Sequence, residues 1–546
     1  MPRMVTTSMV VALFLTLFIP PVQALAGLVP AGKINNVILM IPDGMSVTAT
    51  TLARWYSGHN LAMDELAAGL VRTYSSDAII ADSAPAGSAY ATGWKSQTGN
   101  IATSGEVYNM PGAKVPAEKL RPLGTILEAA HLAGKATGLV CTCEFMHATP
   151  ADFSAHDPSR KEYDNLAEQI VYNNLTVLLG GGSKYMAADS RKDKENLKEI
   201  AISRGYSFIE STAALKAFTG DKLMGVFGKK ADSTAISYDF DRDPAREPAL
   251  AEMTSKALEI LAKNREGFFV MIEGSKIDWA SHANDAIGVI SDVLAFDAAV
   301  KVASDFAKQD QHTLLVVVAD HGNSGLTIGN RSTSSGYDTL PLAAVLEPLK
   351  KAKVTGEGLE SLLPSDLGNT AAIRQVLADN YGISNPSDGE LDAIATAKPG
   401  HLNAVVGPMM GVRAKLGYTT NGHTGEDVVL YDYDPSSARL TGVVDNTDIA
   451  RYMARAIGVD LEQTTARLFV EASAAFGAKG ARVIEDTSVP ENPVLVVVAK
   501  DGNSSLKIPR NKSIAFLNDT PIDSEGVAVR SNGKWYVARN LVELIR

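Results

Sequence analysis

The sequence predicts an α/β protein with a mainly parallel central sheet flanked by helices. Between residues 33 and 475, β-type runs alternate with helical patterns, as they do in successive βαβ units. Three of the runs are continuously apolar, which is typical of parallel strands covered by helices on both faces. A chain of 546 residues, 45% of them apolar, is long enough to bury such a sheet.

Each of the three apolar runs ends in an acidic residue. One run precedes Asp43, one ends in Glu273, and the third precedes Asp320 and His321. Open α/β sheets bind ligands beyond the carboxyl ends of their strands. We therefore expect these side chains to form a site at one edge of the sheet.

The stretch between the first two runs predicts a helix, a strand and a loop. Residues 122–134 have an apolar helical face and end in glycine, a favoured helix stop. Residues 137–143 predict a strand that leads residues 144–150 toward the same site. This strand holds the only two cysteines, Cys141 and Cys143. Residues two apart in a strand are near the upper limit for bridging, so we interpret both as small buried side chains without a mutual disulfide.

The beginning of the chain has the features of a secretory signal peptide. Residues 1–26 contain a basic tip, a short apolar run and small residues suited to cleavage after Ala24 or Ala26. A membrane anchor is the alternative, but the run is short for a span and Pro20 and Pro21 end it. No later stretch has the length of a transmembrane helix. We expect an exported protein, periplasmic or extracellular, with no transmembrane segment after cleavage.

The excess of acidic over basic residues bears on which molecules the protein can bind. The chain has 51 basic against 62 acidic residues and a formal charge of -11. Such a balance disfavours a polyanion as the main partner. We expect no nucleic-acid partner.

Two regions depart from the alternating pattern. Residues 329–423 are rich in Ser, Gly, Pro and Asn, with one amphipathic stretch at 370–379, and we interpret them as an insertion. Residues 476–546 contain short strands separated by Asp-Gly, Asn-Asp and Asn-Gly turns. They predict a small β-rich C-terminal domain that resembles stalk modules of some bacterial exported proteins. Such a domain either attaches the protein to the cell surface or packs on the rest of the chain.

The first cluster with metal-binding chemistry is Asp278 and His282. If this segment is helical, the two side chains at i and i+4 share one face and can hold the same ion. The alternative is a surface pair in which Asp278 and His282 bind only each other.

The second cluster surrounds Ser83. Pro85 suits the first turn of a helix, which places Ser83 at the amino end, where backbone N–H groups and the helix dipole favour a phosphate. The alternative is that Asp82 or Ser83 only caps the helix.

A glycine-rich loop adds His423, which by itself is typical of a surface residue. Catalytic zinc typically binds three N and O donors of the protein and keeps an open position. Asp278 and His282 supply two donors, so His423 can serve as the third. A harder, magnesium-like ion prefers oxygen donors. The predicted sets are Asp278, His282 and His423 for one zinc ion, Asp43, Asp320 and His321 for a second, and Asp43, Thr149 and Glu273 for magnesium.

Taken together, these residues resemble the alkaline phosphatase family over residues 33–474, in order and in spacing. The matching motifs are Asp43-Gly44, Asp82-Ser83-Ala84, His147-Ala148-Thr149-Pro150, Arg160, residues 273–282, Asp320-His321-Gly322 and Asn421-Gly422-His423-Thr424-Gly425. Pro85 and Ser88 depart mildly from the usual pattern. His147 and Trp279 are typical of the branch with His and Trp instead of Asp and Lys, a change that bears on magnesium affinity and phosphate release.

The resemblance implies an enzyme that hydrolyses phosphate monoesters of small molecules. It implies that Ser83 is the nucleophile, forming a phosphoserine intermediate, and that Arg160 clamps the phosphate oxygens. The implied cofactors are two Zn2+ ions and one Mg2+ ion, with inorganic phosphate as product and inhibitor. Family members are often homodimers, so the resemblance is compatible with a homodimer here.

The sequence weighs against three other functions. A sulfatase would need an Arg two residues after the Pro of its nucleophile motif, and Gly87 stands there instead. A phosphodiesterase of the same superfamily is a closer alternative, although Arg160 favours monoesters because it needs unesterified oxygens. A non-enzymatic store of phosphate or metal would not need a nucleophile at Ser83.

Overall fold

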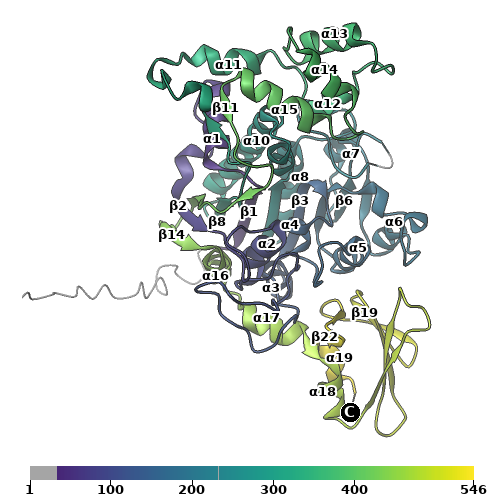
Figure 1. Ribbon diagram of the computed structural model, residues 1–546. Helices are drawn as coiled ribbons and strands as arrows, with labels where there is room; N and C mark the ends of the chain where they lie inside the picture. Colours follow the sequence, from purple (N-terminus) through teal and green to yellow (C-terminus); the bar gives the residue numbers. More distant parts are fainter. Residues whose placement is uncertain (1–33, 231–232, 546) are drawn as a thin grey trace, which may run out of the picture.

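The computed structural model describes residues 34–230 and 233–545 (Figure 1). The expected signal peptide, residues 1–26, lies outside the described residues. The fold is mixed α/β, with a large and mostly parallel central sheet between helices, which confirms the predicted fold class. No helix of the described part of the chain is long and apolar enough to cross a bilayer.

The central sheet has ten strands in the order β14-β2-β13-β8-β1-β7-β3-β4-β6-β5. Strand β13 runs antiparallel to both neighbours, β2 and β8, and the other pairs are parallel. The strands are β1 (Asn36–Pro42), β2 (Ala67–Arg72), β3 (Ala136–Glu144), β4 (Val177–Gly181), β5 (Ser207–Ile209), β6 (Leu223–Val226), β7 (Phe268–Gly274), β8 (Thr313–Val318), β13 (Val428–Tyr433) and β14 (Gly442–Asp445).

The three apolar runs form the adjacent strands β8, β1 and β7 at the middle of the sheet, and all their residues are buried. Their register is parallel, with Met40 opposite Val317 and Ile41 opposite Glu273. The carboxyl ends of the three strands therefore meet at one edge of the sheet, as the acidic residues after them predict.

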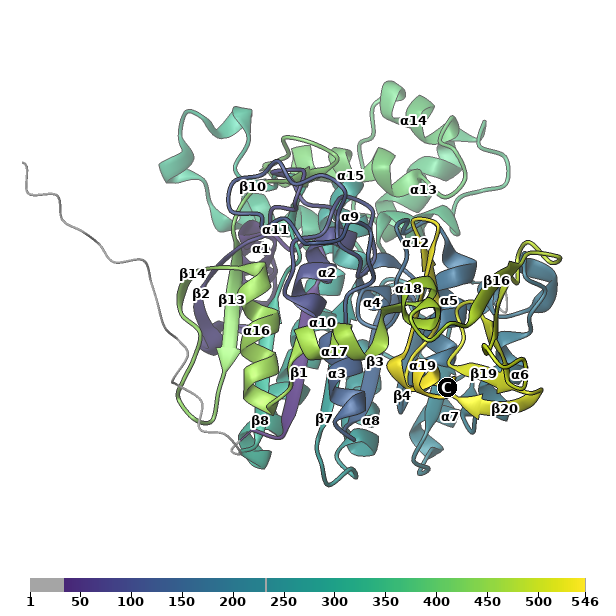
Figure 2. The ribbon, with the colours of Figure 1, turned by 90° about the horizontal axis from the view of Figure 1, so that it is seen from below.

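Helices cover both faces of the sheet (Figure 2). Helices α8 and α10 pack together and against β3, β7 and β8, while α3 and α16 pack together and against β3, β7 and β1. The principal helices of this part are α1 (Val47–Ser57), α2 (Ser83–Thr92), α3 (Ile126–Leu132), α4 (Ala148–Ala151), α5 (Tyr163–Tyr172), α6 (Leu197–Ser203), α8 (Leu250–Leu261), α9 (Lys276–His282), α10 (Ala286–Asp310), α16 (Asn446–Ile457) and α17 (Leu461–Leu468).

The helix predicted over residues 122–134 is shorter than expected. Helix α3 begins after Thr125, whose hydroxyl accepts a hydrogen bond from the backbone N–H of Glu128 while the Glu128 carboxylate accepts one from the backbone of Thr125. This capping box satisfies N–H groups that a helix end leaves free and so fixes the start. The predicted strand at 137–143 is β3, one residue longer at each end.

The region 329–423 contains more helix than the single amphipathic stretch that the sequence predicted. Its helices stand above the carboxyl edge of the sheet in Figure 1 and are α11 (Leu342–Lys350), α12 (Gly356–Glu360), α13 (Thr370–Asn380), α14 (Asp388–Ala395) and α15 (Leu402–Arg413). Internal prolines, Pro348 and Pro408, interrupt the pattern of α11 and α15. Proline inside a helix is unfavourable by itself, so these two helices depend on packing against the rest of the protein for their stability.

The C-terminal residues form two antiparallel sheets with a hydrophobic cluster of their own. One sheet has the order β16-β17-β18-β19-β20 and the other β15-β22-β21. The strands are β15 (Val470–Glu471), β16 (Arg482–Asp486), β17 (Val494–Val498), β18 (Ser505–Pro509), β19 (Ile514–Leu517), β20 (Thr520–Asp523), β21 (Val529–Ser531) and β22 (Lys534–Val537), with helices α18 (Ala472–Gly477) and α19 (Arg539–Glu543). We call residues 470–545 the C-terminal module.

Candidate active site

Ser83 is the first residue of helix α2 and is 2% exposed. Its hydroxyl oxygen lies 3.1 Å from Nε2 of His321. Asp82 occupies the cap position but its side chain makes no cap hydrogen bond, so the alternative that this residue only caps the helix does not describe the structure. The amino end of α2 therefore presents a nucleophilic side chain beside a metal-ligating type of residue, where the helix dipole favours an anion.

The first predicted ligand set is assembled in space. Asp278 and His282 lie one turn apart on α9, and His423 comes from the short strand β12 (His423–Thr424). Nε2 of His282 is 3.4 Å from Asp278 Oδ2, and Nε2 of His423 is 3.5 Å from Asp278 Oδ1. The Asp278 hydrogen bond to His282 raises the pKa of that imidazole to about 9, and the surrounding imidazoles hold the pKa of Asp278 well below its usual range although burial opposes this.

The second predicted set is also assembled and is completely buried. Nε2 of His321 lies 3.4 Å from Oδ1 of Asp43 and 3.3 Å from Oδ2 of Asp320. The ring of His321 stacks on that of His423 at 3.6 Å between centroids. The two predicted zinc sets are therefore neighbours, and the histidine stack joins them.

The third set meets at the ends of β1 and β7 and the start of α4. One ligand atom each from Asp43, Glu273 and His147 lie within 4.8 Å of one another. The predicted ligand Thr149 is fully buried on α4, and its hydroxyl has no hydrogen-bond partner. His147 therefore lies within this set. The sequence predicted His147 only as a supporting residue beside the magnesium ligands.

Several buried oxygen atoms of these sets have no hydrogen-bond partner among the described residues. They are Asp43 Oδ1 and Oδ2, Asp320 Oδ2, Glu273 Oε1 and Thr149 Oγ1. Burial, followed by the charge of Asp320, raises the pKa of Glu273 to about 8, and the same two causes raise that of Asp43. Buried anions without partners are costly. Oxygen and imidazole donors left open in this way fit divalent cations.

Arg160 points its guanidinium at the start of α2. Its Nη1 donates to the carboxylate of Asp82, and its Nη2 lies 3.1 Å from Nε2 of His147. Its backbone N–H donates to the carbonyl of Gly99 at 2.7 Å, which fixes the segment that carries it. The pairing of Arg160 with Asp82 was missed from the sequence, because nothing local to either residue indicates the other.

The predicted supporting residues His147 and Trp279 are in contact. Their rings lie 6.0 Å apart in a T-shaped arrangement. Burial, followed by the charge of Arg160, lowers the pKa of His147 to about 3, so that its imidazole is neutral. A second cation, Lys276, lies 5.2 Å from the ring of Trp279 and pairs with Glu357 of the inserted region. The sequence did not indicate Lys276.

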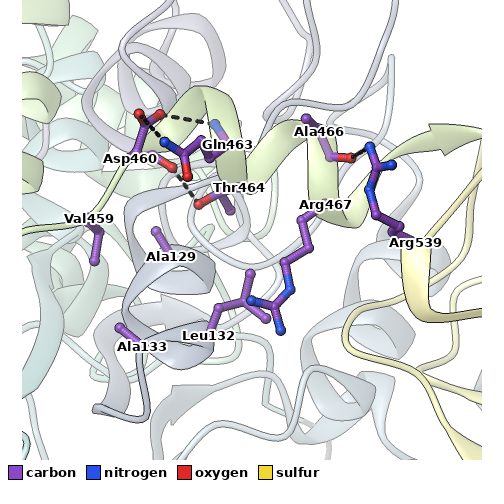
Figure 3. Close-up of a pocket in the computed structure, with 10 residues that line it drawn as sticks. All are labelled: Ala129, Leu132, Ala133, Val459, Asp460, Gln463, Thr464, Ala466, Arg467 and Arg539. Atoms are coloured by element: carbon purple, nitrogen blue, oxygen red, sulfur yellow. Dashed lines mark hydrogen bonds between the residues drawn. The ribbon is translucent and has the colours of Figure 1, made fainter.

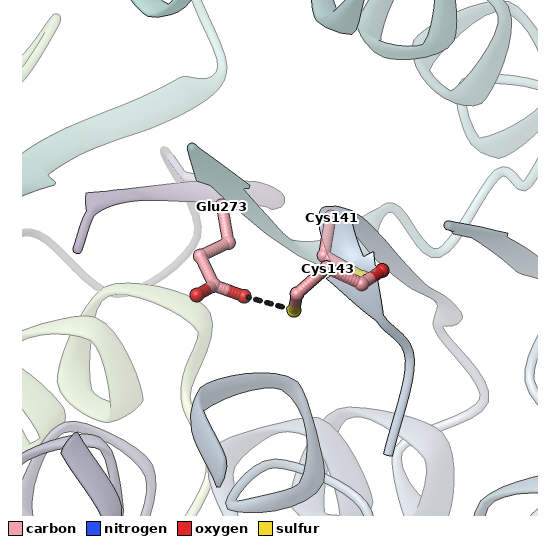
Figure 4. A group of neighbouring side chains, drawn as sticks. All are labelled: Cys141, Cys143 and Glu273. Atoms are coloured by element: carbon pink, nitrogen blue, oxygen red, sulfur yellow. Dashed lines mark hydrogen bonds between the residues drawn. The ribbon is translucent and has the colours of Figure 1, made fainter. Parts of the chain in front are cut away.

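Both cysteines are free and buried, as expected (Figure 4). Cys143 does more than fill space, because its Sγ lies 3.5 Å from Oε2 of Glu273. Cys141 donates instead to the carbonyl of Cys143 at 3.4 Å. Cys143 therefore contacts Oε2 of Glu273, while Oε1 of Glu273 has no hydrogen-bond partner among the described residues.

The fold and the donor groups define a class of protein, an α/β protein with a mostly parallel sheet and clustered donors for divalent cations at the carboxyl ends of its central strands. The chain belongs to the alkaline phosphatase family, because the sequence profile of that family, described as alkaline phosphatase, matches residues 34–459. This finding confirms the resemblance drawn from the motifs. Family membership and fold together support hydrolysis of phosphate monoesters by a metal-dependent enzyme.

Individual relatives agree with this placement. Alkaline phosphatase 4 of Bacillus subtilis (strain 168) is 34% identical over 438 residues, which is 77% of this chain and 87% of that protein. The crystal structure of Thermus thermophilus alkaline phosphatase is similar with a TM-score of 0.69 and 27% identity, over 80% of this chain and 96% of that one. The cold-active alkaline phosphatase of Shewanella sp. gives a TM-score of 0.66 and 29% identity, over 77% and 99%.

Proposed function

We propose that this chain is an exported phosphomonoesterase that works through a phosphoserine at Ser83, with two zinc ions and one magnesium ion. The observation that carries the proposal is the placement of the Ser83 hydroxyl, 3.1 Å from Nε2 of His321. A nucleophile at a helix amino end, beside a guanidinium and open metal donors, suits attack on a phosphoryl group.

The chemistry of the donor groups supports a choice of ion for each set. Sets with imidazole and carboxylate donors suit zinc, and the set of oxygen donors suits magnesium. When bound, the ions would lower the pKa of hydroxyl groups and stabilise the charge on oxygens during phosphoryl transfer. The proposed ligands are Asp278, His282 and His423 for the first zinc, Asp43, Asp320 and His321 for the second, and Asp43, Thr149 and Glu273 for magnesium.

The residues of the chain itself account for binding and for the covalent step. The guanidinium of Arg160 and the N–H groups at the start of α2 would hold the unesterified oxygens of the phosphate. The Ser83 oxygen, after losing its proton to solvent, would bond to phosphorus as the ester P–O bond breaks. The departing alkoxide would take a proton from solvent and leave as the alcohol. Water would then break the bond between Ser83 and phosphorus, releasing inorganic phosphate.

Arg160 favours monoesters over diesters. A monoester has three unesterified oxygens and a diester has two. If a bidentate guanidinium contact holds two of them, only a monoester keeps a third for the N–H groups of α2 and the metal ions. The residues proposed for the site all address the phosphoryl group, so we expect broad tolerance of the leaving alcohol.

Location and assembly are also proposals. Export to the periplasm or the cell exterior is supported by the basic, apolar and small-residue pattern of residues 1–26. Homodimer formation, and attachment to a cell surface through the C-terminal module, are compatible with the family and with the β-rich character of that module.

The test compares p-nitrophenyl phosphate with bis-p-nitrophenyl phosphate, using the purified chain with its metal content measured by elemental analysis. We expect many turnovers of the monoester, a much lower rate on the diester, loss of activity in EDTA and recovery with zinc and magnesium. Faster diester hydrolysis would favour the phosphodiesterase alternative. Phosphate binding without turnover would favour a storage function.

A further inference from the structure

A loop of the C-terminal module, residues 510–513, inserts into the catalytic part of the chain. Asn511 is only 2% exposed and adopts a left-handed backbone with φ of 64°, a conformation that Asn tolerates better than most residues. Its N–H donates to the carbonyl of Ala528 at 2.7 Å, and the N–H of Ala528 donates to the carbonyl of Lys512 at 3.1 Å. The C-terminal module therefore fixes the shape of this loop, which we call the docking loop.

The docking loop binds helix α5 through buried polar contacts. The amide nitrogen of Asn511 donates to Oε2 of Glu168 at 2.9 Å, and its amide oxygen accepts from Nε2 of Gln169 at 3.2 Å. Nζ of Lys512 lies 3.4 Å from Oε1 of Glu168 and also pairs with Glu195. Buried polar groups of this kind lose considerable free energy when one partner is removed.

The same residues of α5 hold the segment that leads to Arg160. Gln169 brackets the backbone of His156, accepting from its N–H at 2.9 Å and donating to its carbonyl at 3.1 Å. Asn165 donates to Oδ2 of Asp157 at 3.0 Å. The other oxygen of Asp157 accepts from the N–H of the residue immediately before Arg160, at 2.9 Å.

The amide oxygen of Asn165 completes the connection. It accepts from Nη2 of Arg510 at 3.2 Å and from Nδ2 of Asn511 at 3.3 Å. One continuous set of hydrogen bonds therefore runs from the docking loop through Asn165 and Asp157 to the backbone next to Arg160. Because neighbouring members of this set share hydrogen-bond partners, a displacement of the docking loop would shift the backbone next to Arg160.

We propose that the docking loop is a positioning element for Arg160, with Asn511 as its central residue. The loop lies outside residues 34–459, the part that matches the family, so the C-terminal module acts on the active site in addition to any attachment role. The proposal rests on the proposed function, in which Arg160 holds the phosphate oxygens. Misplacing a binding group weakens binding strongly even when the group itself is intact.

A second contact of the C-terminal module provides the matched control. Arg467 of α17 pairs with Glu525 at 2.6 Å, and Arg539 donates to the carbonyl of Ala466 at 3.1 Å. Ala466, Arg467 and Arg539 border a cavity of about 490 Å³ between α3, α17 and α19 (Figure 3). No hydrogen bond between described residues leads from Arg467 or Glu525 to the segment before Arg160. Arg467→Gln therefore loosens the module without touching the proposed connection.

The experiment compares Asn511→Ala with Arg467→Gln in the full metal-loaded chain. We expect Asn511→Ala to raise the KM for p-nitrophenyl phosphate and the inhibition constant of inorganic phosphate by roughly fivefold, with unchanged zinc content. Arg467→Gln should leave both constants unchanged. If Asn511→Ala does not fold, Asn165→Ala removes the bond to Asp157 from the other side and should have the same effect.

Arg160→Ala separates positioning from general destabilisation. If Asn511 acts through Arg160, Asn511→Ala should add no further loss of phosphate binding in an Arg160→Ala chain. An equal loss in both backgrounds, or unchanged constants in Asn511→Ala, would overturn the positioning role. If Arg160→Ala alone leaves phosphate binding unchanged, the failure lies in the proposed function of Arg160 and the docking-loop proposal falls with it.

Discussion

The hydroxyl oxygen of Ser83 lies 3.1 Å from Nε2 of His321, a residue 238 positions later in the chain. Two unrelated features produce this contact. Helix α2 begins at Ser83, and strand β8 ends just before Asp320 and His321 at the carboxyl edge of the sheet. The proposed nucleophile and a proposed zinc ligand therefore meet because a helix start and a strand end are held at one edge of the sheet.

Replacing Ser83 with Ala should reduce the turnover of p-nitrophenyl phosphate by at least about a thousandfold, since the covalent route is lost. The hydroxyl is not in any of the three ligand sets, so zinc content by elemental analysis should not change. Turnover within a factor of a few of the original would show that another group attacks phosphorus.

Arg160→Lys should weaken phosphate binding almost as much as Arg160→Ala. Lysine keeps the charge but not the two parallel donors of a guanidinium, and it cannot keep the contacts to both Asp82 and His147. We expect the inhibition constant of phosphate to rise about tenfold or more in both variants. Full retention of affinity in Arg160→Lys would mean that charge alone matters there.

Asp278→Asn should empty the first zinc set while sparing the second. Asp278 lies between His282 and His423, at 3.4 and 3.5 Å from their Nε2 atoms, and an amide is a much weaker ligand than a carboxylate. We expect zinc affinity at one site to fall by at least about a hundredfold. Two zinc ions retained after dialysis would contradict the assignment of this set.

Gly44→Ala should damage the same set indirectly. Gly44 has a φ of 67°, and an added Cβ would lie 2.7 Å from Oδ1 of Asp278. The backbone strain alone costs about 1–2 kcal/mol of stability, and the clash displaces the carboxylate. Gly58→Ala is the matched control, because Gly58 has a φ of 75° and nothing within 4 Å of its added Cβ. Both variants should unfold at lower urea concentration, but only Gly44→Ala should lose zinc.

Asp292→Asn should change how stability depends on pH. Burial raises the pKa of Asp292 to about 7, from an ordinary value of 3.8. Between these values the folded chain binds more protons at this residue than the unfolded chain, so its contribution to stability falls as the pH rises, by up to about 1.4 kcal/mol per pH unit. The amide cannot ionise, so the variant should gain stability relative to the original as the pH rises toward 7.

Urea unfolding of both proteins from pH 4 to pH 8 measures this difference. Asp305→Asn provides the control, because it removes a carboxylate from an exposed position of the same helix. A stability difference between Asp292→Asn and the original chain that does not vary with pH would contradict the raised pKa of Asp292.

Much of the sheet was predictable because its central strands are buried on both faces. The continuous apolar runs of β1, β7 and β8 follow from that burial. The outer strands β2 and β14 at one side of the sheet are short and partly exposed, so no local pattern distinguishes them, and their pairing depends on residues far apart in the chain. The start of α3 was missed because the capping box of Thr125 and Glu128 outweighs the apolar pattern before it.

The candidate site was predictable where the position of a residue at a strand end or on a helix face can be inferred from the local sequence. The proposed ligands stand at strand ends and on one helix face, positions that the motifs identify. The partners of those groups were not predictable, because only the folded chain brings the segments that carry them together. Examples are the contacts of Arg160 with Asp82, of Glu273 with Cys143 and of Lys276 with Glu357.

Trapping a phosphoryl group on Ser83 during turnover distinguishes the proposed covalent route from direct attack by water. The purified chain is mixed with a phosphate monoester, quenched in acid and digested, and the peptide that contains residue 83 is weighed by mass spectrometry. We expect one added phosphoryl group on Ser83, absent in Ser83→Ala. If the quenched enzyme turns over the monoester but carries no phosphoryl group on Ser83, or carries it on another residue, Ser83 is not the nucleophile.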